Sequence, residues 1–265
     1  MAFPEADRVI YEKNPIEEVV CQLRFPAVLK IETEPPAEFQ EGIRSDYPFY
    51  ASKPSVKLPA ALPPEMAALL GTDIPSGFGR TVHEFGSRDA KWTLCLARDF
   101  LAVRCLSYDR WENFVAHLRR PLEALREVYR PAFFSRLGLR YRDVIRRSIL
   151  GLERAPWAEL LQPAVAGALA CSEIAADIEH AAQELLMRLP DSRSQVHVHH
   201  GLTVDPRTQE PCYVIDADFF NQQQSELSDA LERLNFLNHQ SRLFFRWCIR
   251  DRLHQAMRPR PVPQS

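Results

Sequence analysis

Apolar and polar residues alternate with a period of two over several stretches of the chain, which is the pattern of half-buried β-strands. Residues 17–25 form the first stretch, and Pro26 ends it. Residues 80–107 predict three short strands joined by turns. Residues 133–145 predict a longer strand, and residues 195–219 predict a hairpin. These strands form the expected framework of the fold.

Apolar residues recur every three or four positions in three other stretches, which predicts amphipathic helices. These stretches are residues 109–129, 157–189 and 224–257. Pro121 should kink or split the first helix, because proline lacks the amide hydrogen of a helical residue. The third stretch is interrupted at residues 235–238, after which the helical spacing resumes.

Residues 48–79 are rich in proline, alanine and glycine and follow neither period. We expect an irregular excursion with one small helix that begins at Pro63 and Pro64. A loop of this length in a compact domain is usually functional or mobile.

The order of these elements predicts an α+β fold with antiparallel sheets that are each covered by helices. Residues 1–132 and 133–265 have similar element orders, and each half begins with a strand of similar sequence, LRFP at 23–26 and LRYR at 139–142. We therefore expect two tandem β-α-β(2-3)-α halves packed as one unit. Their outline would be similar to TBP-like or helix-grip domains.

The composition is that of an ordinary globular protein, with 265 residues of which 46% are apolar and 26% charged. The net charge of -2 argues against a duplex-DNA binder that relies on phosphate neutralisation. The six cysteines form no CxxC pair, which removes a zinc-ribbon signal and favours a reducing compartment. No signal-peptide core and no run of about 18 apolar residues occurs, so we expect a cytoplasmic protein with no membrane contact.

The hairpin at 195–219 offers a candidate metal site. If Val198 pairs with Ala217, two histidines and two aspartates share the opposite face of the hairpin. Together they could bind zinc or another divalent metal: His197, His199, Asp216 and Asp218. The alternative is two cross-strand His–Asp pairs on a solvated face. His200 should point toward the core.

A second candidate is the basic face of the strand at 133–145. Arg136, Arg140 and Arg142 share this face, and Arg24 could lie on a neighbouring strand. Such a face could bind phosphates, including those of a nucleic acid, or an acidic partner surface. The alternative is that the arginines pair with carboxylates of a packed helix. Gly138, in the strand centre, would let a ligand or another backbone approach.

Aromatic residues in the helical stretches could line a pocket under a helix, although such stripes more often belong to the core. They are Trp111, Phe114, Phe244, Phe245 and Trp247. Catalytic motifs are lacking: the sequence contains no GxSxG elbow and no GxxxxGK phosphate loop. The glycines of GTDIPSGFG, 71–79, have no lysine after them and indicate a loop.

Three segments resemble those of a sporadically distributed, uncharacterised bacterial family of about this length. They are NPIEEVVCQLRFP at 14–26, YDRWENF at 108–114 and RLGLRY at 136–141, together with the phenylalanine-rich last helix. The resemblance covers nearly the whole chain and implies a single unit, without implying any chemistry. The sporadic distribution favours a gene from a mobile or defence cluster.

These observations lead to three hypotheses of function. The first is a non-catalytic interaction protein, an accessory or regulatory subunit whose partner is another protein encoded nearby. The second is a small-ligand binder with an apolar pocket between sheet and helix. The third is a metal-dependent enzyme that uses the hairpin. A nucleic-acid role through Arg140 and its neighbours is a weaker fourth, and it predicts strongly salt-dependent binding.

Overall fold

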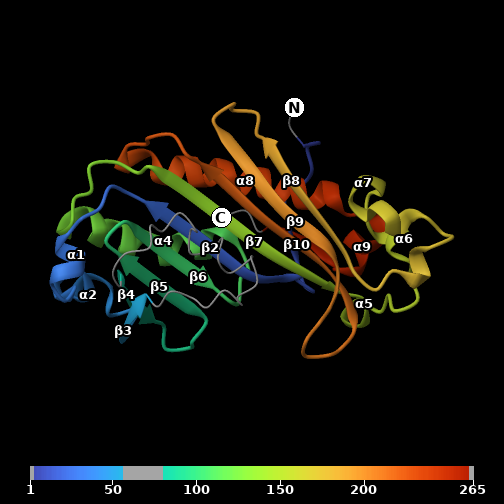
Figure 1. Cartoon of the computed structure of the whole chain (residues 1–265), viewed down its shortest axis with the longest axis horizontal. Helices are drawn as coiled ribbons and strands as arrows, with labels where there is room; N and C mark the ends of the chain where they lie inside the picture. The colour runs from blue at the N-terminus through green and yellow to red at the C-terminus, as the bar shows by residue number, and fades with distance from the viewer. Residues whose placement is uncertain (1–2, 56–79, 263–265) are drawn as a thin grey trace.

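An antiparallel sheet of nine strands runs through the protein (Figure 1). The computed structural model describes residues 3–55 and 80–262 of the chain. The strands are β2 (Ile16–Arg24), β3 (Phe49–Ser55), β4 (Arg80–Gly86), β5 (Trp92–Ala97), β6 (Phe100–Cys105), β7 (Arg136–Arg146), β8 (Ala181–Arg188), β9 (Ser194–Val204) and β10 (Pro211–Asn221). Their order across the sheet is β3-β4-β5-β6-β2-β7-β10-β9-β8.

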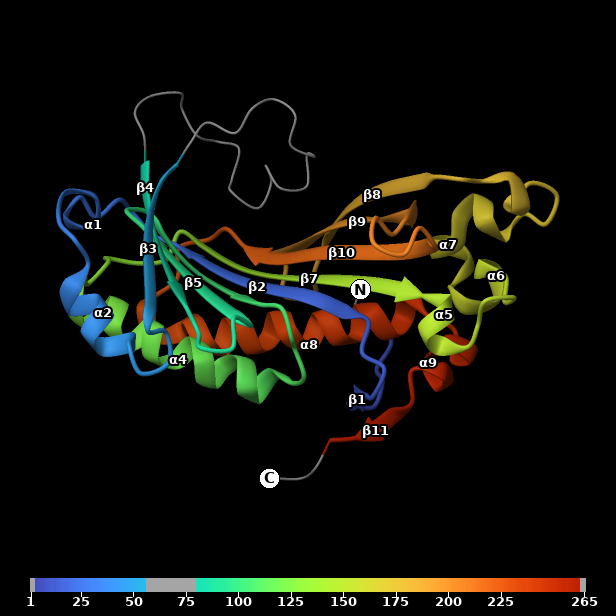
Figure 2. The ribbon, with the colours of Figure 1, turned by 90° about the horizontal axis from the view of Figure 1, so that it is seen from below.

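Two long helices, α4 (Trp111–Val128) and α8 (Ala230–Cys248), lie on the same face of this sheet (Figure 2). We call this the inner face and the opposite one the outer face. The shorter helices are α1 (Lys30–Thr33), α2 (Ala37–Ile43), α5 (Arg147–Leu150), α6 (Trp157–Leu160), α7 (Pro163–Ala166) and α9 (Asp251–Ala256). Single 3-10 turns lie at Gly167–Ala170, Ala175–Asp177 and Leu227–Asp229. Strands β1 (Val9–Tyr11) and β11 (Pro259–Pro261) form a separate two-stranded sheet.

The centre of the sheet is the antiparallel pair β2 and β7. Cys21 pairs with Leu139 and Leu23 pairs with Leu137, and all four side chains are buried on the inner face. Because β2 precedes residue 132 and β7 follows it, the two expected halves share one sheet. Each half has the same pairing scheme, since β2 pairs with β6 and β7 with β10, the strands that precede α4 and α8. The tandem origin of the halves stays a prediction.

The α+β class is confirmed, and so are the three strands of 80–107 and the hairpin of 195–219. The excursion expected at 48–79 begins instead with a strand, β3, which pairs with β4. The small helix expected at Pro63 lies outside the described residues. None of the described helices has both the length and the apolar character needed to cross a membrane.

Pro121 does not split the helix, because α4 continues through this residue as one helix. Pro121 cannot donate to the carbonyl of His117 one turn earlier. The hydroxyl of Tyr47 donates to that oxygen instead, at 3.2 Å. Tyr47 is fully buried, so a packed side chain supplies the missing donor within the core.

The predicted interruption at 235–238 is also wrong, because α8 is continuous. Two asparagines that broke the apolar spacing face polar groups of the core. Asn235 accepts a hydrogen bond from Trp111 Nε1 at 2.6 Å, and Asn238 accepts one from the hydroxyl of Tyr141 at 2.9 Å. These contacts attach α8 to α4 and to β7.

The helical prediction for 157–189, with breaks near Pro163 and Cys171, is wrong in its second part, where two 3-10 turns are followed by strand β8 at Ala181–Arg188. The segment reads AAQELLMR, and each of these residue types favours helices in isolation. Pairing with β9 overrides this preference, since Ala181 to Arg188 all pair along its edge. Strand β8 is the last strand of the sheet, and this position matters for the sites below.

Candidate functional site

The outer face of β7 carries the arginines that the sequence placed together. Side chains alternate across a strand, so Leu137 and Leu139 enter the core while Arg136, Arg140 and Arg142 point outward. The alternation therefore gives the basic face that was expected.

Carboxylates of β10 pair with two of these arginines. Arg136 Nη2 lies 2.7 Å from Asp218 Oδ2. Arg140 binds Asp216 with two nitrogens, and the Nε–Oδ1 distance is 2.5 Å. Only 13% of the Arg140 side chain and 9% of the Asp216 side chain are exposed, so this is a largely buried ion pair. Burial lowers the pKa of Arg140, but the hydrogen bonds and charge of Asp216 outweigh it and raise that pKa above its ordinary value.

The remaining arginines of the strand meet carboxylates of β2 and of the hairpin turn. Arg142 Nη1 lies 2.6 Å from Glu17 Oε2. Arg146 contacts Glu17 as well, and its Nε lies 2.5 Å from Asp205 Oδ2. Backbone hydrogen bonds, the first of them from Arg207, and the contact with Arg146 lower the pKa of Asp205. The charges of these arginines are thus compensated by carboxylates of neighbouring strands and of a turn. A packed helix was the alternative source of carboxylates expected from the sequence.

Arg24 lies opposite Arg136 in the pairing of β2 with β7. Its Nε donates to Gln22 Oε1 at 3.2 Å, and Arg136 Nη1 approaches the same oxygen at 3.4 Å. The room at Gly138 is taken by Arg136, because a Cβ there would overlap its guanidinium group. Arg136 also stacks over the ring of Phe220, 4.9 Å from its centre.

The register of the hairpin is the one on which the metal hypothesis depended. Val198 pairs with Ala217, so His199 lies opposite Asp216 and His197 lies opposite Asp218. Both aspartates, however, are held by arginines of β7 on their other side.

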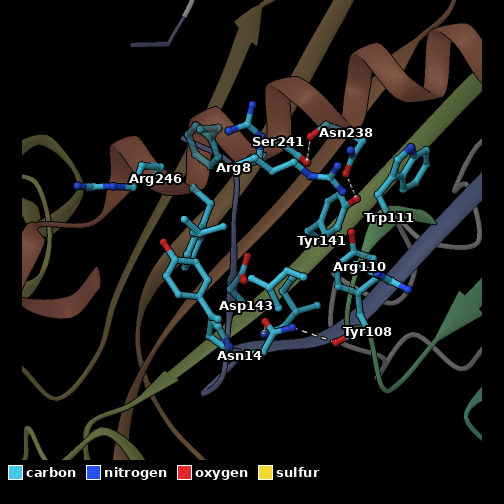
Figure 3. A pocket seen from close by; sticks show the side chains of 18 of the residues that line it. Arg8, Asn14, Tyr108, Arg110, Trp111, Tyr141, Asp143, Asn238, Ser241 and Arg246 are labelled. Atoms are coloured by element: carbon cyan, nitrogen blue, oxygen red, sulfur yellow. Dashed lines mark hydrogen bonds between the residues drawn. The ribbon is translucent and has the colours of Figure 1, made fainter. Parts of the chain in front are cut away.

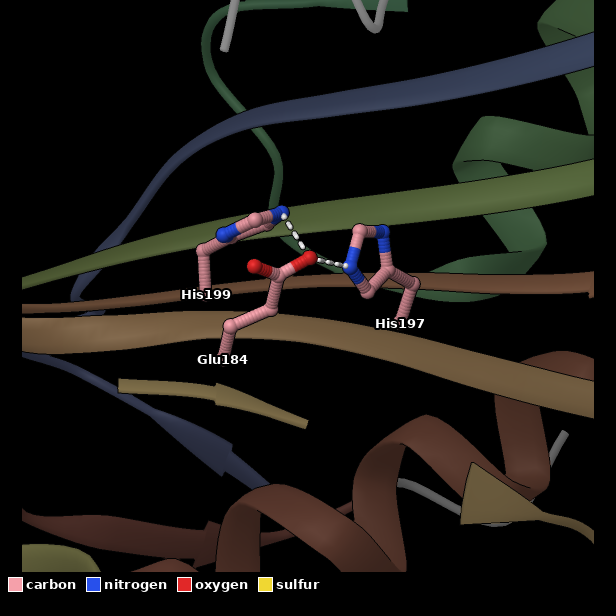
Figure 4. Close-up of side chains that lie close together, drawn as sticks. All are labelled: Glu184, His197 and His199. Carbon is pink, nitrogen blue, oxygen red and sulfur yellow. Dashed lines mark hydrogen bonds and ion pairs between the residues drawn. The ribbon is translucent and has the colours of Figure 1, made fainter. Parts of the chain in front are cut away.

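The histidines instead contact a carboxylate that sequence reasoning missed, Glu184 of β8 (Figure 4). Its Oε1 lies 2.6 Å from His197 Nε2 and 3.8 Å from His199 Nε2. The hydrogen bond from His197, with the charge of His199 next in size, lowers the pKa of Glu184. Glu184 was overlooked because the prediction assigned its segment to a helix.

His200 points toward the core as expected and is 5% exposed. Its Nδ1 lies 2.8 Å from the hydroxyl oxygen of Tyr213, and that hydroxyl donates to the carbonyl of Val165 at 2.6 Å. The one hydroxyl hydrogen is therefore used, and Nδ1 of His200 carries the donated hydrogen. Burial lowers the pKa of His200, consistent with a neutral structural imidazole.

A cavity of about 110 Å³ lies between the sheet, α8 and the N-terminal segment (Figure 3). Strand β7 contributes Tyr141 and Asp143, and residues 7–11 close one side. Seven aromatic residues line it, Tyr11, Tyr108, Trp111, Tyr141, Phe219, Phe244 and Phe245, together with four arginines, Arg8, Arg110, Arg242 and Arg246. The aromatic stripes of the sequence thus belong to the core, and part of them also lines a pocket.

Asp143 is the unusual residue of this cavity. It lies on the inner face opposite Ile16 and Ile215 and is only 4% exposed. No hydrogen bond of its carboxyl group to the described residues contributes to its pKa, which burial and the charge of Asp216 set. Burial, assisted by the charge of Asp216, raises the pKa of Asp143 to about 8.

Polar contacts fix the residues around Asp143. Asn14 Nδ2 donates to the carbonyl of Tyr108 at 2.9 Å. The hydroxyl oxygen of Tyr11 lies 2.7 Å from Nδ1 of His254. Burial raises the pKa of Tyr11 to about 12, so its hydroxyl stays protonated. These residues are therefore held by polar contacts of their own, while the carboxyl group of Asp143 has no hydrogen-bond partner among the described residues.

No protein-family model and no curated protein matches this sequence, so the function is argued from the geometry of these sites.

Removing Asp216 should strongly destabilise the protein, because it leaves Arg140 buried without its counter-charge. We expect Asp216→Ala to lower the free energy of unfolding by about 3 kcal/mol, measured by urea denaturation. The matched control is Glu159→Ala, which breaks the exposed pair with Arg252 and should cost at most about 1 kcal/mol. Equal losses in the two variants would contradict the buried-pair account.

The pKa of Asp143 predicts a pH dependence of stability. Its folded-state pKa of about 8 exceeds the unfolded value of about 4, so between these values the folded protein holds the extra proton. The contribution of Asp143 to the free energy of unfolding is fully present below about pH 4. It falls as the pH rises toward 8, by up to about 1.4 kcal/mol per pH unit. Asp143→Asn should remove this slope in urea unfolding. If the free energies of unfolding of the wild type and Asp143→Asn changed in parallel with pH, the pKa of Asp143 would not be raised in the folded protein.

Proposed function

We propose that this protein is a non-catalytic binder of a small, planar, neutral molecule, which it holds in the cavity beneath α8. The observation that carries this proposal is Asp143, a buried carboxyl group without a partner in the described chain that lines an aromatic cavity. Buried polar groups are normally hydrogen-bonded, so an exception inside a cavity favours a bound ligand.

The protonation state of Asp143 indicates what the ligand presents. With a pKa of about 8 the group is mostly a neutral acid at neutral pH. A neutral carboxyl group offers one O–H donor beside one carbonyl acceptor. The complementary edge has an acceptor beside a donor, as in a primary amide, a lactam or a nitrogen heterocycle.

The walls and the volume support the same class. Aromatic side chains favour a flat apolar body that packs against their rings. The volume of about 110 Å³ is smaller than the about 150 Å³ of an engineered protein cavity that takes up benzene, so the ligand is no larger than about one ring and its remaining atoms reach the open side of the cavity. Ligand binding would also stabilise the N-terminal segment, because residues 7–11 form part of the wall.

The expected cytoplasmic location belongs to the same proposal. All six cysteines are free thiols, and four of them are buried, which supports a reducing compartment.

Benzamide is a suitable probe, because it joins one ring to an amide edge. We expect wild-type protein to bind it with a Kd on the order of 1 mM or tighter, seen as amide chemical-shift changes in NMR titrations. Benzoate, of the same size, should bind more weakly, because it cannot donate a hydrogen bond to the carbonyl oxygen of protonated Asp143. Asp143→Leu should abolish benzamide binding.

Asp143→Asn is the matched control, since its amide also presents a donor beside an acceptor. It should retain benzamide binding, while the wild type alone loses affinity above about pH 8 as Asp143 ionises. Equal binding of benzamide and benzoate, or unchanged binding in Asp143→Leu, would contradict the proposal.

A protein partner is the second candidate function, and the open edge of the sheet favours it. No described strand pairs with the outer edge of β8, and Leu185 and Leu186 are 40% and 62% exposed there. An unpaired edge with exposed leucines can accept a strand from another chain. A partner encoded by a neighbouring gene, in a mobile or defence cluster, would use this edge.

This second proposal predicts a complex with a partner protein that forms only when the edge of β8 is intact. Purification with the products of the neighbouring genes, followed by intact-complex mass spectrometry, should recover a stoichiometric complex. The double variant Leu185→Lys, Leu186→Lys should lose it, because lysine on an edge strand opposes pairing. Leu29→Lys, at a leucine that is 65% exposed elsewhere, should keep it. A complex that survives the double variant would exclude the β8 edge.

A further inference from the structure

Strands β8 and β9 bring three metal-binding side chains together on the outer face of the sheet. His197 and His199 are two residues apart and so point to the same side of β9. Glu184 pairs directly with His199 across the strands and is a diagonal neighbour of His197. Strand pairing, and not a flexible loop, therefore sets their positions.

The distances between the donor atoms suit one small cation. One donor atom from each side chain lies within 4.8 Å of the other two (Figure 4). In a tetrahedral zinc site with bonds of about 2.0–2.1 Å, the donor atoms are about 3.3 Å apart. The separations of 2.6 and 3.8 Å from Glu184 Oε1 to the two imidazole nitrogens lie on either side of that value. Small side-chain rotations suffice to reach it.

The donor types select among metals. Two imidazole nitrogens and one carboxylate oxygen are typical of zinc sites that keep a fourth position open. Calcium and magnesium prefer oxygen ligands only, and this set lacks the thiolate or thioether that selects copper(I).

The charges around the cluster are compatible with a cation. Asp216 and Asp218 hold Arg140 and Arg136, so these arginines are neutralised and the aspartates are not needed as ligands. The open side of the cluster faces a surface groove that Glu184 and His199 line together with His180. A cation bound to the cluster would be open to water or a further ligand from this groove.

We propose that Glu184, His197 and His199 form a zinc site on the β8–β9 edge, separate from the cavity beneath α8. The site differs from the one expected from the sequence, since Glu184 takes the place of the two aspartates.

Calorimetric titration with zinc chloride tests this site on full-length protein prepared without a polyhistidine tag. We expect one zinc per chain in the wild type and the loss of at least about tenfold in affinity in Glu184→Gln and in the double variant His197→Ala, His199→Ala. Zinc should also raise the Tm of the wild type but not that of these variants. The three side chains are partly or largely exposed, so the variants should fold, which circular dichroism checks.

His180→Ala is the matched control, because this exposed histidine lines the same groove outside the cluster. It should keep zinc affinity within about twofold, and Asp143→Leu should also keep it, since the cavity is a different site. Failure to bind zinc at about 100 µM, or affinity unchanged in Glu184→Gln, would overturn the proposal. So would a requirement for His180, which would indicate an adventitious surface site.

Discussion

The antiparallel pairing of β2 with β7 is the constraint on which the rest of the structure depends. It joins the first and second halves of the chain into one sheet, and its register is set by apolar side chains such as Cys21 and Leu139 on the inner face. A slip of one residue would turn these side chains outward and the arginines of β7 into the core. The same register places α4 and α8 on one face. The pairing is irregular only at Glu17, beside the position of Asp143.

Two aspartates of the sheet show how differently a buried carboxylate can be accommodated. Asp216, on the outer face, accepts hydrogen bonds from Nε and Nη2 of Arg140, which compensates its charge although the pair is almost covered. Asp143, on the inner face, has no such partner, and burial favours its protonated form. The charge of Asp216 is therefore compensated within the sheet, while the carboxyl group of Asp143 is left for a ligand to satisfy. This contrast is the physical basis for placing the binding function beneath α8.

Local patterns predicted much of the fold and less of the sites. Alternation over 195–219 suggested a register in which Val198 pairs with Ala217, and the structure has this register because a buried face fixes it. Strand β8 was missed because helix-favouring residues are held in a strand by pairing with β9, and Glu184 was missed with it. The continuity of α4 depends on the hydroxyl of Tyr47, far away in sequence. Asp143 had no signal, since its cavity is assembled from β7, α8 and the N-terminal segment.

The central claim is that the cavity around Asp143 holds a small molecule. Native mass spectrometry of protein isolated rapidly under gentle conditions tests this most directly, with wild type and Asp143→Leu compared in parallel. The account predicts that wild-type protein carries a discrete additional mass of a small organic molecule, and that the Asp143→Leu preparation shows the polypeptide mass alone. The polypeptide mass alone in both preparations, also after incubation with a metabolite extract, would contradict it.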